Sequence, residues 1–417
     1  MPYFTRCLKF PLKRVAQSNP VILLTTELPW SVTMAWMGSY LTLFLVHEHL
    51  TPNRIGLALG IGSLLQVFGL AGSGMLSRHL GRKGTIMLGD FMGWVLVLGV
   101  WALLRSPLWL AIGVIANQAG GFVGPAWNSL FSEGANSERL PAFFLMLQGL
   151  TIGGGLILPF MAPMVRHLGV VAVGHYLLWF LWPAVTLSWT LRLIGLRESK
   201  EGRESMAATR PNMRQVIAHI RIGLTGAGLT LSGLRILVQV PVVLFATFAP
   251  LALVAQRGAS LPAHELAYLP IAGALSAIGL GILHGVQPRR PHRGMILVSV
   301  LLLLTGFATL TFGPRHDFVA VMIGWMLVIA GQSQFWTSHT SYWMTWLPDA
   351  VRVEIQGWTG VVTASVVALL SPLIATLYAQ HPRLMLGSSA VVFALAGVLW
   401  TRLPKPPVAT DSSPQRN

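Results

Sequence analysis

Long stretches without charged residues are the feature that most limits what this chain can fold into. A helix that crosses about 30 Å of hydrocarbon needs about 20 apolar residues. Only 10% of the 417 residues are charged, whereas a soluble domain has about a quarter. The sequence therefore predicts an all-α integral membrane protein. Its twelve expected helices are 20–46, 53–77, 84–104, 107–131, 139–164, 169–196, 222–255, 263–286, 294–313, 317–346, 352–380 and 383–402.

The net charge of +16 first suggests a nucleic-acid binder, but the distribution of the charge excludes it. Such a protein gathers basic residues on a solvated face, and here a mean hydropathy of +0.64 reflects apolar runs through most of the chain. The one cysteine, Cys7, cannot form an internal disulfide. The first apolar run breaks at residues 25–29 without a cleavage site, so we expect helix 1 to be retained.

Basic residues concentrate on one side of the expected membrane. If both termini are cytoplasmic, 22 of the 29 basic residues, Arg192 among them, fall on cytoplasmic segments and six on outer loops. Arg235 alone remains within the membrane. Lys and Arg accumulate on the cytoplasmic side of cell membrane proteins, and this bias predicts the orientation.

The longest polar segment divides the chain into two halves of six helices. Short matches recur at an offset of 208 to 210 residues, such as Gln148-Gly149 with Gln356-Gly357. We therefore expect an internal repeat. The expected organisation is a cytoplasmic segment 1–19, a bundle 20–196, a cytoplasmic linker 197–221, a bundle 222–402 and a disordered tail 403–417.

The loop between helices 2 and 3 resembles the signature loop of the major facilitator superfamily, G-x-x-x-D-[RK]-x-G-[RK]-[RK]. Gly74, Gly81, Arg82 and Lys83 match the pattern, and Arg78 stands where the family has an aspartate. The resemblance implies two six-helix bundles that rock about a central site, with helices 1, 4, 7 and 10 lining it. A fainter echo of the family is Glu133 followed by Arg139 after helix 4.

The missing aspartate raises a question about the loop. In the family this acid lies near the N-terminus of helix 11, where the helix dipole favours negative charge. We expect either a charge swap, in which Arg78 pairs with Glu354 in the first turn of helix 11, or an Arg78 that faces lipid headgroups.

Polar side chains recur in helices 1, 4, 7 and 10, and within a membrane such groups face protein or a wet cavity. This pattern agrees with the cavity that the resemblance implies. Besides the titratable residues considered next, the candidate substrate residues are Tyr40, Asn117, Asn128, Gln239, Gln332 and Trp336.

Arg235 and Glu27 are the main candidates for substrate binding and coupling. Arg235 lies about 20 Å along the expected helix 7, where an unpaired charge costs several kcal/mol. It binds an anionic substrate group, switches between ion pairs, or belongs to a static pair. Glu27, within helix 1, is either a proton carrier or a fixed, ion-paired acid.

Two further titratable residues lie within expected helices. Asp90 is not on a cavity-lining helix, and we interpret it as a structural partner of the nearby basic loop. His339 shares a face of helix 10 with several tryptophans and is either a buried, hydrogen-bonded residue or a proton or substrate ligand. The tryptophans either stack on the substrate or pack and anchor the helices.

The sequence contains little that resembles a metal, cofactor or enzyme motif. His47-Glu48-His49 lacks a third ligand nearby, and no phosphate-binding loop or nucleophile elbow occurs. We predict no enzyme activity, cofactor or metal site.

The resulting prediction is a monomeric cell-membrane transporter that exports an amphiphilic or drug-like organic solute in exchange for protons, with lipids as its other contacts. Proton-coupled uptake of a small organic anion bound at Arg235 is an alternative. So is a non-transporting protein of the same fold that acts as a sensor or in lipid translocation.

Overall fold

The computed structural model describes residues 19–133, 147, 149–151, 153–207, 221, 225–286, 293–346 and 349–403. Every regular element in these residues is helical. The first elements are α3 (Asn19–Thr25), α4 (Leu28–Trp36), η1 (Met37–Leu41), α5 (Thr42–His47), α6 (Pro52–Asp90), η2 (Phe91–Val95), α7 (Leu96–Leu103), α8 (Pro107–Ala119), η3 (Gly120–Val123) and α9 (Gly124–Glu133). The others are η4 (Leu158–Met161), α11 (Ala162–Gly195), α12 (Lys200–Ala207), α14 (Gly226–Val254), η5 (Ala263–Tyr268), α15 (Leu269–Val286), α16 (Arg293–Phe312), α17 (Phe318–Trp346), α18 (Asp349–Gln380) and α19 (Pro382–Thr401).

Ten helical stretches in the described residues are long and apolar enough to cross a membrane. Two features explain why the number differs from the twelve expected spans. The first expected helix is divided into α3, α4, η1 and α5, none of which is long enough alone. One stretch, Gly149–Gly195, covers two expected spans and bends at Gly169, whose φ is 82°.

Glycine and proline set the main breaks in these helices. Gly81 has a φ of 73° inside α6, a left-handed conformation that glycine adopts without steric cost, and it separates the second and third expected spans. Pro29 lies in the first turn of α4, where a missing N–H is tolerated. Because α3 ends at Thr25, Glu27 lies in a short link within helix 1.

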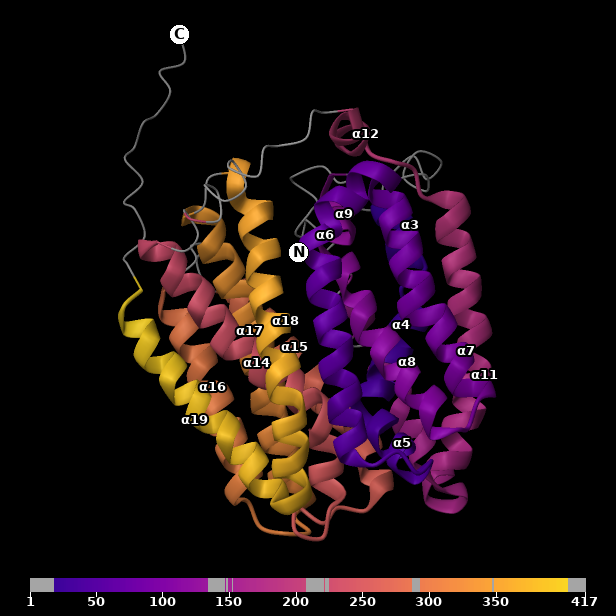
Figure 1. Ribbon diagram of the computed structural model, residues 1–417. Helices are drawn as coiled ribbons and strands as arrows, with labels where there is room; N and C mark the ends of the chain where they lie inside the picture. The colour runs from indigo at the N-terminus through magenta and orange to yellow at the C-terminus, as the bar shows by residue number, and fades with distance from the viewer. Residues whose placement is uncertain are drawn as a thin grey trace.

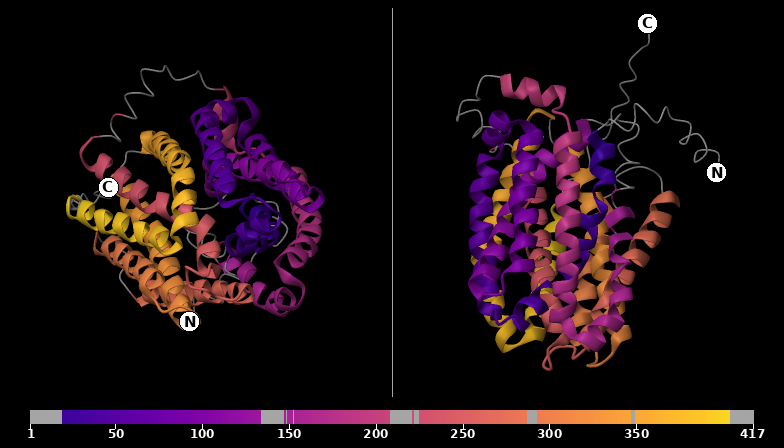
Figure 2. Two further views of the ribbon diagram at one scale, coloured as in Figure 1. Left: turned by 60° about the horizontal axis from the view of Figure 1, so that its bottom comes forward. Right: turned by 90° about the vertical axis from the view of Figure 1, so that its right-hand side faces the viewer.

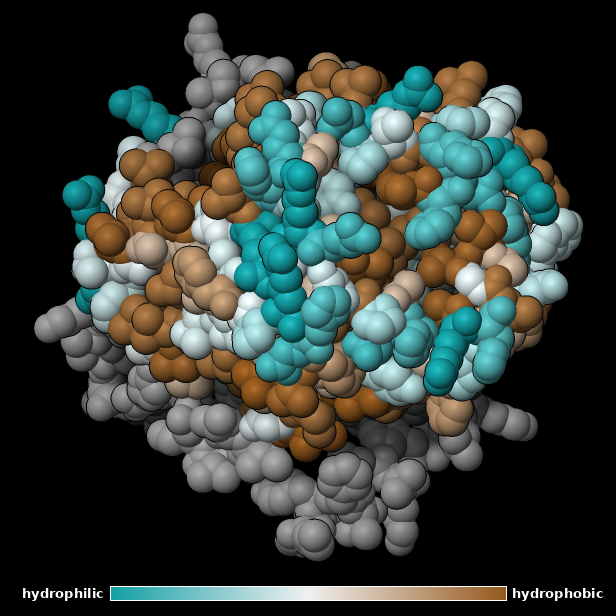
Figure 3. Space-filling model, turned by 90° about the horizontal axis from the view of Figure 1, so that it is seen from below, coloured by the Kyte–Doolittle hydropathy of each residue, from teal (hydrophilic) through white to brown (hydrophobic). Residues whose placement is uncertain are grey.

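The elements form two groups that lie side by side (Figure 1). The elements up to α11, from indigo to magenta, are on one side, and those from α14 to α19 are on the other; the left view of Figure 2 shows the same division. The short helix α12 lies at one end of the molecule, called here the α12 end. Hydrophilic residues spread over much of the opposite end (Figure 3), as expected for loops beyond apolar helices.

Many large apolar side chains are exposed along the sides of the bundle. Phe160 and Phe312 are each 81% exposed, and Ile194 is 77% exposed. Apolar exposure on this scale is unusual for a soluble monomer. It suits a surface that faces lipid.

The two groups approach most closely where α6 packs on α18. A methyl group added at Gly56 would contact the Ala375 side chain and lie 2.8 Å from the Ser371 carbonyl oxygen. One added at Gly60 would lie 2.9 Å from the Ala368 carbonyl oxygen. Small residues of this kind allow membrane helices to pack backbone to backbone.

The segment expected to be a polar linker contains a helix, α12, and an anchor for the signature loop. The Lys83 backbone N–H donates a hydrogen bond to Glu198 Oε2 at 2.9 Å. Glu198 also lies against Gly81, where an added methyl group would clash with its carboxylate. An acid from the start of this linker therefore holds the loop.

Several expected features lie outside the described residues, wholly or in part. These are most of segment 1–19, Arg139, the linker beyond residue 207 apart from residue 221, the tail from residue 404, and the side chains of Glu133 and Glu354. The pairing of Arg78 with Glu354 therefore stays a prediction. Leu403, the first residue of the expected tail, is buried.

The α6–α18 contact gives a test of helix packing. We expect Gly56→Ala to destabilise the protein by about 1–3 kcal/mol, because the new methyl group overpacks the interface. A matched control is Gly72→Ala on the same helix, where an added methyl group meets nothing within 4 Å and improves helix propensity. Thermal unfolding in detergent measures both, and equal Tm values would contradict the close approach.

Candidate functional site

A buried ionic cluster joins three helices near the α12 end. Arg192 of α11 contacts Glu27 Oε2 through Nη2 at 2.6 Å and Asp90 Oδ2 through Nη1 at 3.0 Å. Its Nε donates a hydrogen bond to Thr26 Oγ1 at 2.8 Å. The Arg192 side chain is 2% exposed, and those of Asp90 and Glu27 are 6% and 18% exposed. We call Glu27, Asp90 and Arg192 the charge cluster.

The local structure explains why these side chains meet. Glu27 occupies the N-cap position of α4 but makes no capping hydrogen bond, so its carboxylate is available to Arg192. Trp30, one turn along α4, places its ring 4.8 Å from the guanidinium. The cluster thus satisfies Arg192 with two carboxylates, a hydroxyl and an aromatic face.

The cluster corrects two sequence-based interpretations. Arg192 was assigned to the cytoplasmic basic group, but it is buried, because it points inward one turn before α11 ends at Gly195. Asp90 was interpreted as a partner of the basic loop and instead pairs with Arg192. For Glu27, the structure shows the ion-paired alternative in this conformation. A signal was present, since Arg192 lies inside the apolar run 169–196.

A second cationic site is formed by α14 and α17. The Arg235 guanidinium carbon lies 4.6 Å from the ring centre of Trp336 and 5.0 Å from that of Trp343. Its Nε donates a long hydrogen bond to Gln239 Oε1 at 3.5 Å. Among the described side chains, no carboxylate forms an ion pair with Arg235. Because α14 begins at Gly226, Arg235 lies about 14 Å along it at 1.5 Å per residue.

Two groups beside Arg235 remain available for a ligand. The Trp336 side chain is 48% exposed, so one aromatic neighbour of the guanidinium is accessible. Trp343 is 1% exposed, and its indole N–H has no acceptor among the described residues. A buried donor without an acceptor is unfavourable, and an incoming oxygen would satisfy it.

His339 is a packing residue in this conformation. Its Nε2–H donates a hydrogen bond to the Leu231 carbonyl oxygen at 2.9 Å, which links α17 to α14. The ring stacks on Phe335 at 4.9 Å, and the side chain is 1% exposed. This arrangement is the buried, hydrogen-bonded alternative for His339.

The other candidate substrate residues do not all converge. Asn117 donates to the Gly93 carbonyl oxygen at 2.8 Å, and that glycine lies in the π-helical turn η2, which leaves carbonyls to be satisfied. Tyr40 is 2% exposed and donates to the Ala263 carbonyl oxygen at 3.2 Å. Asn128 and Gln332 are exposed. The structure therefore gathers only Gln239 and Trp336 around Arg235.

The histidines after helix 1 do not form a metal site. Glu48 Oε1 lies 2.8 Å from Nε2 of His175, and His47 Nδ1 lies 2.7 Å from the Leu43 carbonyl oxygen. Within the described residues, no three His, Cys, Asp or Glu side chains are grouped to hold a metal ion.

Comparisons with known proteins now identify the fold. No protein-family model matches the sequence, and no curated protein matches it. Solved structures do match. A mutant of the nucleoside transporter NupG has a TM-score of 0.66 at 12% identity, with 92% of this chain and 100% of that chain covered. The chain therefore shares the fold of this transporter structure.

Two further solved structures share this fold. An auto-inhibited POT family peptide transporter has a TM-score of 0.62 at 15% identity, covering 92% of this chain and 96% of that chain. The human organic anion transporter MFSD10 (TETRAN) has a TM-score of 0.60 at 15% identity, covering 92% and 100%. All three similar proteins are transporters rather than enzymes. Together with its ten apolar helices, the fold makes this chain a multi-pass membrane protein.

The charge cluster predicts an asymmetry between losing one member and losing all. We expect Arg192→Met to destabilise the protein by about 3–5 kcal/mol, because two buried carboxylates lose their shared cation. Adding Glu27→Gln and Asp90→Asn to the same chain should recover much of the loss. Thermal unfolding in detergent compares the wild type, the single variant and the triple variant.

The matched control for this experiment is Arg197→Ala, five residues further along the chain and exposed. Exposed charges contribute about 0–1 kcal/mol. If Arg192→Met and Arg197→Ala unfold at the same temperature, the ionic cluster does not stabilise the fold.

Proposed function

We propose that this chain is a secondary active transporter that moves an amphiphilic organic solute carrying an acidic group, coupled to protons. Its twelve spans form two halves, 20–196 and 222–402, which rock about a central site by alternating access. The protein works as a monomer in the cell membrane, with the α12 end and both termini in the cytoplasm. The observation that carries the solute class is the absence of an ion-paired carboxylate at Arg235 among the described side chains.

The surroundings of Arg235 support an anionic solute. Two cation–π contacts contribute about 0.5–2 kcal/mol each, while a charge in mid-membrane costs several kcal/mol. A carboxylate would accept two hydrogen bonds from the planar guanidinium, and the unpaired indole N–H of Trp343 offers a third donor. The exposed Trp336 ring would pack against the apolar body of the solute. One structural neighbour is an organic anion transporter by name, which fits the same class.

The charge cluster supports proton coupling. With all three groups ionised, two carboxylates share one guanidinium, and the cluster carries one negative charge in a buried place. One proton would neutralise it and release a carboxylate from Arg192. Glu27 is the more exposed of the two acids, and we assign the coupling proton to it.

Export by proton antiport is the form expected from the sequence. In sealed vesicles the sign of the pH gradient that drives accumulation of the solute distinguishes antiport from symport. Accumulation driven by either gradient would support coupled transport. If no organic anion, neutral solute or cation is transported, the proposal of a transporter is wrong, and the chain is instead a sensor or a lipid-translocation protein of the same fold.

Substrate binding at Arg235 is tested by ligand-induced thermal stabilisation. Organic carboxylates should stabilise the wild type, whereas their amide analogues should not. We expect Arg235→Ala to weaken carboxylate affinity at least ~30-fold, because truncating one partner of a buried charge pair costs about 2–5 kcal/mol. Trp343→Phe, which keeps the ring and removes the N–H, should weaken it less.

The control for Arg235 is Arg257→Ala, an exposed arginine in the loop after α14. It should bind carboxylates as the wild type does. Equal affinities of Arg235→Ala and Arg257→Ala would place the substrate site elsewhere.

Proton coupling is tested with Glu27→Gln. This variant should still bind the solute and exchange it between vesicle compartments, because the Arg235 site is intact. It should lose accumulation driven by a pH gradient, because the amide cannot take up the coupling proton. Flux of labelled solute into proteoliposomes, with and without the gradient, measures both properties.

Glu204→Gln is the matched control, since the Glu204 side chain in α12 is 65% exposed. It should keep gradient-driven accumulation. If Glu27→Gln accumulates solute as well as Glu204→Gln does, another group carries the proton.

A further inference from the structure

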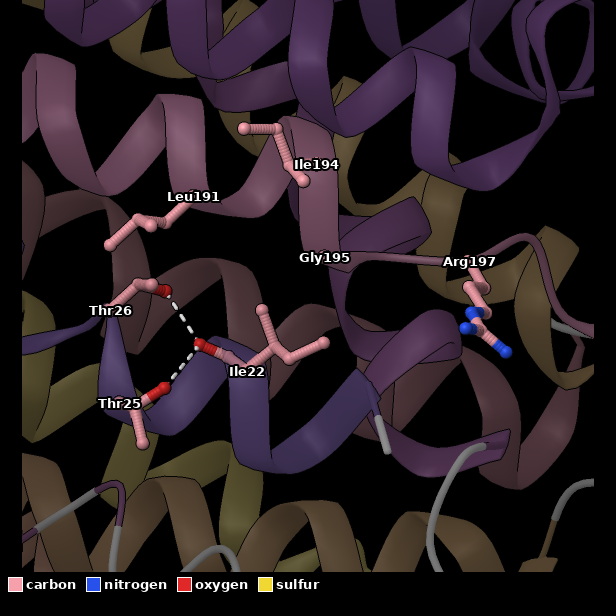
Figure 4. A pocket seen from close by; sticks show the side chains of 7 residues that line it. All are labelled: Ile22, Thr25, Thr26, Leu191, Ile194, Gly195 and Arg197. Atoms are coloured by element: carbon pink, nitrogen blue, oxygen red, sulfur yellow. Dashed lines mark hydrogen bonds between the residues drawn. The ribbon is translucent and has the colours of Figure 1, made fainter. Parts of the chain in front are cut away.

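A cavity lies between α3 and the end of α11, next to the charge cluster and lined by none of its three charged residues. Its volume is about 350 Å³, large enough for a ligand group rather than a single water. Figure 4 shows the helix α11 residues on one side and the α3 residues on the other. The lining residues are Ile22, Thr25, Thr26, Leu191, Ile194, Gly195 and Arg197.

The cavity lies at the edge of the apolar region. Gly195 is the last residue of the membrane-crossing stretch Gly149–Gly195, and Arg197 follows it. A hydrocarbon core of about 30 Å that ends with this stretch would place lipid headgroups at the level of Arg197.

One wall of the cavity continues into the lipid-facing surface. Leu187, Leu191 and Ile194 are 61%, 49% and 77% exposed, and their spacing of four and three residues places them on one face of α11. This apolar strip leads from the cavity toward the middle of the membrane. An acyl chain can follow it.

The mouth of the cavity is cationic. The Arg197 backbone is fixed by Asn19, which donates to its carbonyl oxygen at 2.8 Å and accepts from its N–H at 3.0 Å. The exposed guanidinium makes no hydrogen bond or ion pair with the described residues. Its N–H groups can bind phosphate oxygens.

From this geometry we infer that the cavity binds the phosphate headgroup of an anionic phospholipid, with one acyl chain along Leu191 and Ile194. Charge complementarity favours a lipid with net negative charge over a zwitterionic one, whose own cation would lie beside Arg197. Basic pockets between membrane helices bind anionic headgroups in this way. The inference requires only that the chain spans a membrane, and it is independent of the transported solute.

The bound lipid would touch the wall of the charge cluster. Thr26 lines the cavity, and its hydroxyl oxygen also accepts the hydrogen bond from Arg192 Nε. Its own proton is donated to the Ile22 carbonyl oxygen at 2.7 Å (Figure 4). A lipid at this site would therefore brace α3 against α11 beside Glu27.

Thermal unfolding of the purified full chain in mixed micelles tests the inference. Phosphatidylglycerol should raise the Tm saturably, while phosphatidylcholine and inorganic phosphate should not. We expect Arg197→Ala to weaken the apparent affinity for phosphatidylglycerol at least ~10-fold, the size of a lost charge-assisted contact. Ile194→Gln should weaken it too, by making the acyl wall polar.

The control is Arg402→Ala, another exposed arginine, just after α19. It should keep the full response, and all variants should unfold normally without lipid. Equal stabilisation by phosphatidylcholine, or an unchanged response of Arg197→Ala, would overturn the inference. Stabilisation by inorganic phosphate alone would also overturn it, since a free anion and not a lipid would then be the ligand.

Discussion

The contact of one guanidinium with two carboxylates organises the half of the molecule that precedes α12. Arg192, Glu27 and Asp90 come from three separate stretches of the chain. Because a buried charge is unfavourable unless it is paired, their burial requires the three stretches to pack together. Removing one partner of such a group is far more damaging than never having it. The cluster therefore fixes how the broken first helix sits against α6 and α11, while its surplus negative charge leaves room for one proton.

In the half that follows α12, the buried cation has different neighbours. Arg235 is surrounded by two indole rings and an amide oxygen rather than by ion-paired acids. Aromatic faces are weaker partners than carboxylates, so this cation keeps more capacity to bind an external anion. Under the proposed function, the cluster with its surplus negative charge would exchange the proton, and the cation without an ion-paired acid would bind the substrate.

The sequence predicts the helix positions well because apolar length and turn residues determine them locally. The expected spans 294–313 and 383–402 differ by one residue at each end from α16 and α19. Which side chains pair between helices depends on how each helix is rotated about its own axis, and no local sequence pattern specifies this rotation. The charge pattern therefore places Arg192 wrongly among the cytoplasmic residues, because a basic residue one turn from a helix end resembles an orientation signal. Tyr40 and Asn117 are polar residues within apolar helices, a pattern that predicts a cavity. In the structure, each donates a hydrogen bond to a backbone carbonyl oxygen instead.

Three close contacts between the two halves, all among described residues, contain no charged group. Gly56 meets Ser371 on α18, Tyr40 donates to the backbone at Ala263, and an added methyl group at Gly155 would lie 2.9 Å from the Pro270 side chain. Neither Arg192 nor Arg235 takes part in these contacts, and both lie nearer the ends of α11 and α14 that lead to α12. The ion pairs of Arg192 lie within one half, and Arg235 has no ion-paired carboxylate among the described side chains. Under the proposed function, a proton or an anion at either arginine would therefore first change the packing of helices within its own half.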